Sequence, residues 1–300
     1  PLPRNKPSNE LKSALLAAAQ ADPGNLIAAR LICREIRDRD PVFSAEELKT
    51  LKINPWLKCM LSGRSYLKQG WNARGGGFAD TVTPQGWKDF FANVDKARQE
   101  FVSAWELEPT IPEAAAELIE ISVIGEKKEE KRLWLKRAVE NQIDYGPAFQ
   151  NYLFYSRPRW GGSLKEPLIM MNAALSAEIP GSTLPLVALA AQRTFLDETP
   201  LVTNWAFYNL PQCSEPMLQA LEKLDGDPNI RIPQRRYLTG SRVAIAMLAG
   251  KIDQSAELNA RLDDDDYPGN NQCFPVAPFH YFKMNELLPA LMKQPDLPKF

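Results

Sequence analysis

The stretch Ala97-Arg-Gln-Glu-Phe101-Val-Ser-Ala104-Trp-Glu-Leu-Glu-Pro109 decides the fold of this chain. Ala97, Phe101 and Ala104 follow helical spacing, so they share one face of a predicted helix. Pro109 follows that helix and ends it, because proline cannot continue an α-helical hydrogen-bond pattern. The stretch therefore predicts a helix that buries a face of small and aromatic side chains against a neighbouring helix.

The same pattern returns elsewhere in the chain. Ala138 repeats the small residue 34 positions after Ala104, and 34 residues is the length of a tetratricopeptide repeat (TPR), whose second helix carries the signature A-x-x-x-F-x-x-A-x-x-x-x-P. Leu15, Ala18 and Pro23 reproduce the last three positions of the signature near the start of the chain. We therefore predict an all-α fold, a TPR-like, right-handed α–α superhelix of stacked helix pairs.

Helical periodicity covers almost the whole chain, and no segment alternates apolar and polar residues over a length that predicts a strand. Beyond Pro180 the repeat register is lost, so the C-terminal part is predicted to be a divergent helical cap. The predicted regions are a tail at 1–8, N-terminal helices at 9–70, a TPR-like core at 71–198 and a C-terminal helical region at 199–300.

Several helix starts are marked by capping residues. Capping boxes are predicted at residues 44–47 and 163–166, where a serine precedes a glutamate by three positions. Thr83 is the predicted N-cap of a long helix that runs to Leu107, with proline in its first turn. Its predicted buried side consists of Trp87, Phe90, Phe91, Val94, Ala97, Phe101 and Ala104.

Composition excludes several functional classes. Lys and Arg total 36 against 37 Asp and Glu, a net charge of −1, so the chain has no overall attraction to nucleic acid or to an anionic membrane. The longest apolar run, Leu184–Ala191, is much shorter than the roughly 20 residues that a membrane span needs. A hydrophobic fraction of 44% is ample for a packed interior.

Four cysteines in 300 residues favour a reducing compartment such as the cytoplasm. The chain begins with Pro1, and a removed signal peptide would leave the periplasm open as well. Cys33 and Cys59 lie in apolar helical contexts and are predicted to be core residues. Cys213 and Cys273 lie in connections rich in Pro and Asn, where either free thiols or a disulfide fits the sequence.

Residues 71–163 carry two further motifs. An ARGGG loop at Ala73–Gly77 precedes the segment Thr81–Trp87 and an Ala-rich helix that ends at Leu107-Glu-Pro109, and Pro158-Arg-Trp-Gly-Gly-Ser163 follows about two helices later. This combination resembles a bacterial domain-of-unknown-function family, DUF four thousand and thirty-four. Ile143-Asp144 departs from the Asp-Pro that the family pattern has there. The resemblance implies a TPR-like helical domain and no catalytic residues.

No catalytic or metal-binding motif was found. The sequence has no P-loop, no H-E-x-x-H and no G-x-S-x-G, and its single histidine is His280. Asp263–Asp266 lacks the spacing of a calcium loop. We therefore predict no metal, no cofactor and no catalytic residue. The Arg74–Gly77 loop is interpreted as structural, with an anion-binding nest of backbone amides as the alternative. Exposed aromatic residues are expected at Asn204–Asn209.

These observations favour a non-enzymatic scaffold that binds a protein or peptide partner. A narrower version is an accessory or immunity-type protein of a bacterial toxin or secretion system. One alternative is a glycan-active hydrolase or sugar-binding protein with a carboxylate-lined aromatic cleft; another is a structural assembly unit that self-associates. The candidate partner contacts flank the two Gly-rich breaks and are Trp71, Arg74, Trp87, Tyr152 and Trp160.

Overall fold

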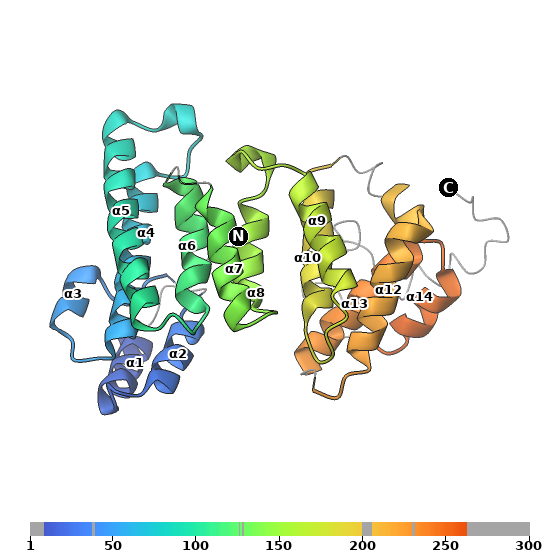
Figure 1. Ribbon diagram of the computed structural model, residues 1–300, viewed down its shortest axis with the longest axis horizontal. Coiled ribbons are helices and arrows are strands. Elements are labelled where there is room, and N and C mark those ends of the chain that lie inside the picture. The colour runs from blue at the N-terminus through green and yellow to red at the C-terminus, as the bar shows by residue number, and fades with distance from the viewer. Residues whose placement is uncertain are drawn as a thin grey trace. The chain divides into compact units, whose positions relative to one another are not determined.

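The computed structural model describes residues 9–37, 40–125, 127, 129–199, 206–229 and 232–262. Every regular element within these ranges is helical, and none of them contains a strand. The prediction of an all-α fold is therefore confirmed. The chain divides into two units, Pro1–Tyr152 and Leu153–Phe300, each of which is built from packed helices (Figure 1).

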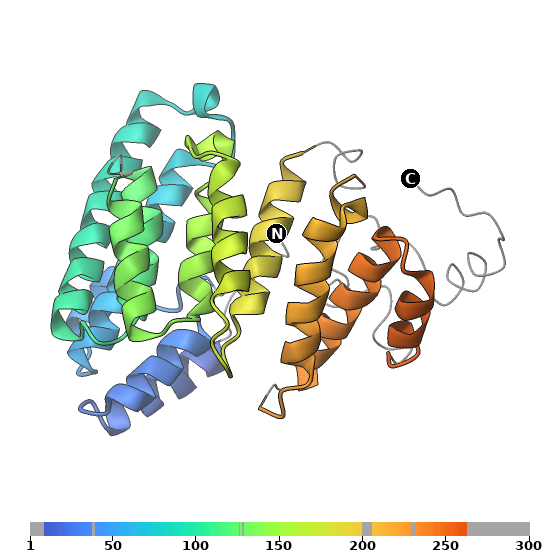
Figure 2. The same ribbon diagram turned by 45° about the vertical axis from the view of Figure 1, so that its right-hand side comes forward.

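Within its described residues, the first unit contains seven helices and the first part of an eighth. They are α1 (Asn9–Ala21), α2 (Leu26–Glu35), α3 (Ala45–Thr50), α4 (Pro55–Arg74), α5 (Pro84–Leu107), α6 (Glu113–Ile124), α7 (Glu130–Asn141) and α8 (Gly146–Phe154), with a short 3-10 helix, η1 (Ala79–Thr81), between α4 and α5. The two longest, α4 and α5, lie side by side as a helical hairpin (Figures 1 and 2). Helix α6 packs against α5 and α7.

The stretch that decided the fold lies in the core of this unit. Ala97, Phe101 and Ala104 are completely buried on α5, and so is Ala138 on α7. The helix ends at Leu107, as predicted. These small and aromatic residues therefore form the surfaces on which neighbouring helices pack.

The predicted buried side of α5 was wrong at its N-terminal end. Phe90 and Val94 are buried, but Phe91 is 37% exposed and Trp87 is only partly covered. Residue 91 lies one position beyond the buried row 90, 94, 97, 101, and one position is about 100° around a helix. An aromatic residue next to the buried row can thus lie at the boundary with solvent.

The predicted starts of α3 and α5 are confirmed. Ser44 and Glu47 form a reciprocal capping box before α3, and the Thr83 hydroxyl accepts a hydrogen bond from the Gly86 amide at the start of α5. The boundary predicted between the N-terminal helices and the TPR-like core, at residues 70 and 71, falls inside α4, which continues to Arg74.

The second unit holds the rest of α8 and a series of shorter helices. They are η2 (Pro158–Trp160), α9 (Lys165–Ser176), α10 (Leu184–Asp197), α12 (Pro211–Asp225), α13 (Ile232–Leu248) and α14 (Ile252–Asn259), with a short helical segment at 206–209. Helix α9 packs on α10, α12 on α13, and α13 on α14. On α13, the buried Arg242 binds the carboxylates of Glu222 and Asp225, each at 2.7 Å.

The capping box predicted at residues 163–166 was wrong. The Ser163 hydroxyl accepts a hydrogen bond from the Lys165 amide, whereas the Glu166 amide donates to the Ser163 carbonyl oxygen. The Glu166 carboxylate accepts a hydrogen bond from the Ser156 hydroxyl at 2.8 Å. The chain folds back here so closely that a Cβ on Gly162 would lie 2.0 Å from the Ser156 carbonyl oxygen. A contact with the preceding loop therefore replaces the local box.

Some predictions concern residues outside the described ranges: the tail at 1–8, Trp205, Cys273, Asp263–Asp266, His280 and the helix expected at 282–293. Cys33, Cys59 and Cys213 are free thiols. Among the described helices, none combines the length and apolar character required to cross a membrane.

Candidate functional site

Three of the five predicted contact residues meet where α4 turns into α5. Trp71 lies in the last turn of α4 and Trp87 in the first turn of α5. The guanidinium carbon of Arg74 lies 5.7 Å from the ring centroid of Trp71 and 5.1 Å from that of Trp87. Both distances are within the range of cation–π attraction. The arginine thus joins the ends of the two helices.

Arg74 also binds the glycine loop that follows it. Its Nη1 donates to the carbonyl oxygens of Gly75 at 3.1 Å and Gly77 at 3.0 Å. Gly75 adopts a φ of 76°, which favours glycine over any other residue. The guanidinium is therefore engaged with loop carbonyls, which supports the structural interpretation of the Arg74–Gly77 loop over an anion-binding nest.

The loop presents one aromatic side chain to solvent. Phe78 is 84% exposed, the largest exposed fraction among the large hydrophobic residues described. Its backbone is nevertheless fixed, because both the hydroxyl and the amide of Thr81 donate to the Phe78 carbonyl, at 2.7 and 3.0 Å. A single exposed apolar ring is ordinary on a protein surface, and it indicates a contact site only as part of a larger apolar patch.

A second exposed ring lies on the adjoining face of α5. Phe91 stacks on Trp87 with centroids 5.7 Å apart and an interplanar angle of 19°. The buried Phe90 contacts Trp71 edge-on at 5.0 Å, and the Trp71 indole donates to Glu120 on α6 at 3.4 Å. These contacts anchor the cluster to the core. We define the α4–α5 aromatic surface as Trp71, Arg74, Phe78, Trp87 and Phe91.

The other two predicted contact residues lie elsewhere. Tyr152 is 5% exposed, and the ammonium of Lys131 lies 4.5 Å above its ring. Trp160 belongs to the second unit, where its ring packs against Phe154 and Tyr155 at 6.0 and 5.2 Å. Neither residue is part of the α4–α5 aromatic surface, and Tyr152 presents almost no area to a partner.

The buried carboxylates of the first unit are paired with arginines. Glu113 on α6 is 2% exposed and binds Arg30 and Arg34 of α2, with closest distances of 2.9 and 3.0 Å. One turn further along, Glu117 binds Arg64 of α4 at 2.7 Å. Such pairs fix the positions of three helices, because a buried charge is tolerated only when it is compensated. Removing Glu113 would leave two arginines without this carboxylate, and removing Arg64 would leave Glu117 without its arginine.

Burial also controls the cysteine between these helices. It raises the pKa of the Cys33 thiol to about 11, although the nearby Arg64 opposes this effect. The thiol is therefore protonated at neutral pH and is a poor nucleophile. In the parts of the chain that the structure describes, no group of His, Cys, Asp and Glu side chains is arranged to hold a metal ion.

Sequence reasoning did not single out Phe78, the most exposed member of the surface. The available signal was its position directly after three glycines and before a short polar segment, since an apolar residue in such a loop has few neighbours to bury it.

Comparison with known proteins adds no assignment: no protein-family model, curated protein or solved structure matches the chain.

Proposed function

We propose that this protein is a TPR-like helical-repeat scaffold that binds a protein partner through the α4–α5 aromatic surface. The observation that carries the proposal is the 84% exposure of Phe78 on a loop whose backbone is hydrogen-bonded to Arg74 and Thr81. The 34-residue interval from Ala104 to Ala138, with both alanines completely buried, supports the TPR-like register.

The energetics favour this loop as an anchor. Burying one Phe side chain contributes about 1.5–3 kcal/mol, and a loop already held in one conformation loses little further entropy on binding. Aromatic residues and arginine are also the side chains enriched at the centres of interfaces. A partner with an apolar pocket would therefore gain most of its affinity from Phe78, with the stacked Phe91 and Trp87 at the start of α5 as further contacts.

Charge does not favour an anionic membrane as the binding partner. Asp80 and Lys88 are exposed near the loop, and Asp89 and Arg74 are half-buried at the same end of the hairpin. Two acidic and two basic groups leave no net positive charge to attract anionic lipid headgroups. A protein pocket that accepts an apolar ring fits this surface better.

The resemblance of residues 71–163 to DUF four thousand and thirty-four agrees with a scaffold of this kind. Within it, an accessory or immunity-type role beside a bacterial toxin or secretion system is the narrower proposal. Its simplest test is genomic: a toxin-like gene next to the gene for this chain supports it, whereas an isolated housekeeping locus counts against it.

The binding proposal is tested by affinity purification from the source organism, with the bound proteins identified by mass spectrometry. The bait is the full chain as wild type, Phe78→Ala and the control Leu133→Ala, which removes a 44% exposed apolar side chain from α7. One stoichiometric partner should be retained by wild type and Leu133→Ala. Its affinity for Phe78→Ala should fall about tenfold or more.

Two outcomes would contradict the proposal, and they differ in meaning. A partner that Phe78→Ala retains at full affinity would show that binding occurs at another surface. Recovery of no partner by the wild-type chain would remove the binding function itself.

The variant Arg74→Lys tests whether Arg74 holds the glycine loop in place rather than contacting the partner, because a lysine lacks the planar guanidinium that lies near both tryptophans. It should increase amide hydrogen exchange across residues 75–82.

A further inference from the structure

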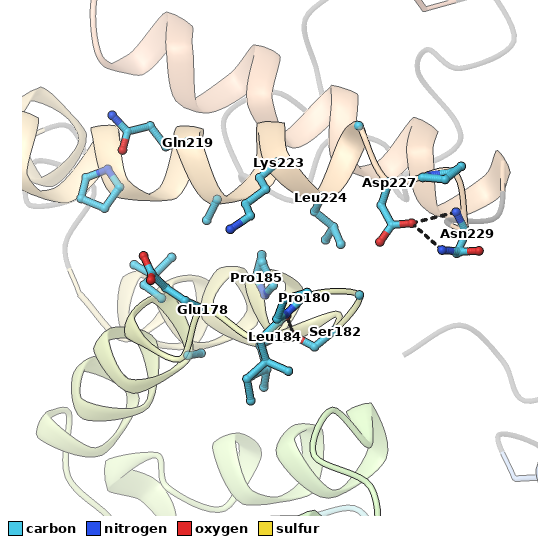
Figure 3. A pocket seen from close by; sticks show the side chains of 18 residues that line it. Glu178, Pro180, Ser182, Leu184, Pro185, Gln219, Lys223, Leu224, Asp227 and Asn229 are labelled. Carbon is cyan, nitrogen blue, oxygen red and sulfur yellow. Dashed lines mark hydrogen bonds between the residues drawn. The ribbon is translucent and has the colours of Figure 1, made fainter.

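The second unit contains a large open groove that the α4–α5 aromatic surface does not involve. Its volume is about 870 Å³, and it lies between α12 and the connection from α9 to α10 (Figure 3). Pockets of roughly 300–1,000 Å³ are the size that bound ligands occupy. The groove is therefore large enough for a short segment of another chain.

Helix α12 supplies an apolar row along this groove. Pro216, Ala220 and Leu224 line it at intervals of four residues, which places them above one another on a helix. Leu184 and Pro185, at the start of α10, line it from the opposite side. Leu184 and Leu224 are buried, so the apolar floor that a ligand meets consists mainly of Pro216, Ala220 and Pro185.

A polar row runs beside the apolar one. Gln219, Lys223 and Asp227 also line the groove at intervals of four residues, the last of them just beyond the end of α12. Figure 3 shows Lys223 reaching from α12 toward the opposite wall, with Asp227 at one end of the groove. The groove therefore has a basic group in the last turn of α12 and an acidic group just beyond the end of that helix.

Both charged groups are available to a ligand. Among the described residues, no carboxylate lies within ion-pairing distance of the Lys223 ammonium. In Asp227, a single carboxylate oxygen accepts both hydrogen bonds from Asn229, at 2.8 and 3.0 Å. The second oxygen is left for another donor.

The walls of the groove are held in place. Arg235 of α13 donates to the carbonyl oxygens of Asp225 and Asp227, which fixes the turn after α12. On the opposite wall, Glu178 has a φ of 41° and Gly181 a φ of 72°. A positive φ is rare for a residue other than glycine, and such conformations cluster at ligand sites.

The spacing of the polar row matches that of an extended peptide. Within α12, the four residues from Gln219 to Lys223 rise about 6 Å, and two residues of an extended chain rise about 6.6 Å. Asp227 lies two residues beyond the end of the helix and continues the row. Alternate side chains of an extended chain also point to opposite sides. A peptide lying along α12 would thus place residues i and i+2 beside Lys223 and Asp227, and residue i+1 on the apolar floor.

We propose that this groove binds an extended peptide segment in which an acidic, an apolar and a basic residue follow one another. The acidic side chain pairs with Lys223, the apolar one lies against the half-buried Pro185 on the wall opposite α12, and the basic one pairs with Asp227. Glu178 adds a second negative charge to the groove, which disfavours peptides with an excess of acidic residues. This site does not depend on the role assigned to Phe78.

The test uses the full chain and three fluorescein-labelled peptides that differ only at their centre, Glu-Leu-Lys, Lys-Leu-Lys or Glu-Leu-Glu between alanines. Fluorescence anisotropy should show saturable binding of the first peptide, about fivefold or more tighter than either of the others. Lys223→Glu should reverse this order in favour of Lys-Leu-Lys. Lys165→Glu, the same change at an exposed position on α9 that does not line the groove, should leave the order unchanged.

The proposal is overturned if Lys223→Glu leaves the peptide preference unchanged, or if none of the three peptides binds saturably. A loss of peptide binding in Phe78→Ala would also overturn it, because the peptides would then occupy the α4–α5 aromatic surface. Conversely, peptide binding that responds to Lys223→Glu and ignores Phe78→Ala would establish the groove even if no partner is recovered through Phe78.

Discussion

Gly63 is the position at which a single methyl group should test the packing of the α4–α5 hairpin. It lies in the buried face of α4, and a Cβ built on it would lie 2.6 Å from one carbon of the Phe101 ring and 2.8 Å from two others. Phe101 is completely buried, and in a close-packed interior its ring can move away only by displacing other buried side chains. The glycine therefore permits the closest approach of α4 and α5.

The expected cost of Gly63→Ala follows from two opposing effects. Alanine is favoured over glycine within a helix by about 1 kcal/mol, whereas overpacking a core costs about 1–3 kcal/mol. The three contacts are far shorter than the 3.5–4.0 Å optimum between carbon atoms, which places the cost in the upper part of its range. We therefore expect a net loss of about 1–2 kcal/mol in the free energy of unfolding.

The assay is urea denaturation followed by circular dichroism, with Gly146→Ala as the matched control. A Cβ on Gly146, at the start of α8, would have no atom within 4 Å, so this variant should be neutral or slightly stabilised. Combining Gly63→Ala with Phe101→Leu should cost less than the sum of the two single changes, by 0.5 kcal/mol or more. A stabilised Gly63→Ala, or strictly additive effects, would refute the reasoning.

Two further predictions concern the loop before α9 and the cap of α3. Gly162→Ala should destabilise the second unit more than Gly63→Ala destabilises the first, because the added Cβ would lie 2.0 Å from the backbone oxygen of Ser156, which no side-chain rotation relieves; a thermal melt that matches wild type would contradict this. Hydrogen bonds from Lys12 and Ser44 lower the pKa of Glu47 to about 2 from 4.5. The stability that this carboxylate contributes is therefore complete above pH 4.5 and lost as the pH falls toward 2. Glu47→Gln should reduce the acid-side fall in the urea midpoint, with a small effect at pH 7 because the pair is exposed.

The helices were predictable because their start signals are local. Thr83 binds an amide three residues further along, and the box at 44–47 closes within one turn. The box at 163–166 failed for the opposite reason, since Glu166 binds Ser156 across a loop. The spacing of residues within a helix gives no information about a hydrogen-bond partner that comes from a preceding loop, as Ser156 does for Glu166.

The site was predictable only where chain geometry alone brings residues together. Trp71 and Trp87 flank a turn between two adjacent helices, so their meeting around Arg74 follows from the hairpin. The sequence cannot distinguish Tyr152 from an exposed aromatic residue of the same helical spacing. In the structure, the Lys131 side chain lies over its ring and covers it. The groove beside α12 needs walls from segments about 40 residues apart in the chain, residues 174–185 and 216–229, and no pattern within one helix predicts that they meet.

The glycine loop illustrates why composition is a poor guide to the mobility of a binding surface. Three consecutive glycines would be expected to lower the rigidity of the segment, because glycine has the largest backbone freedom. In this chain the carbonyls of Gly75 and Gly77 are bound by Arg74, whose guanidinium also lies within cation–π distance of two tryptophans. The backbone entropy is therefore lost when the hairpin folds. A partner that binds Phe78 meets a loop whose conformation is already fixed, so the affinity of this surface should depend on the Arg74 contacts as well as on the Phe78 ring.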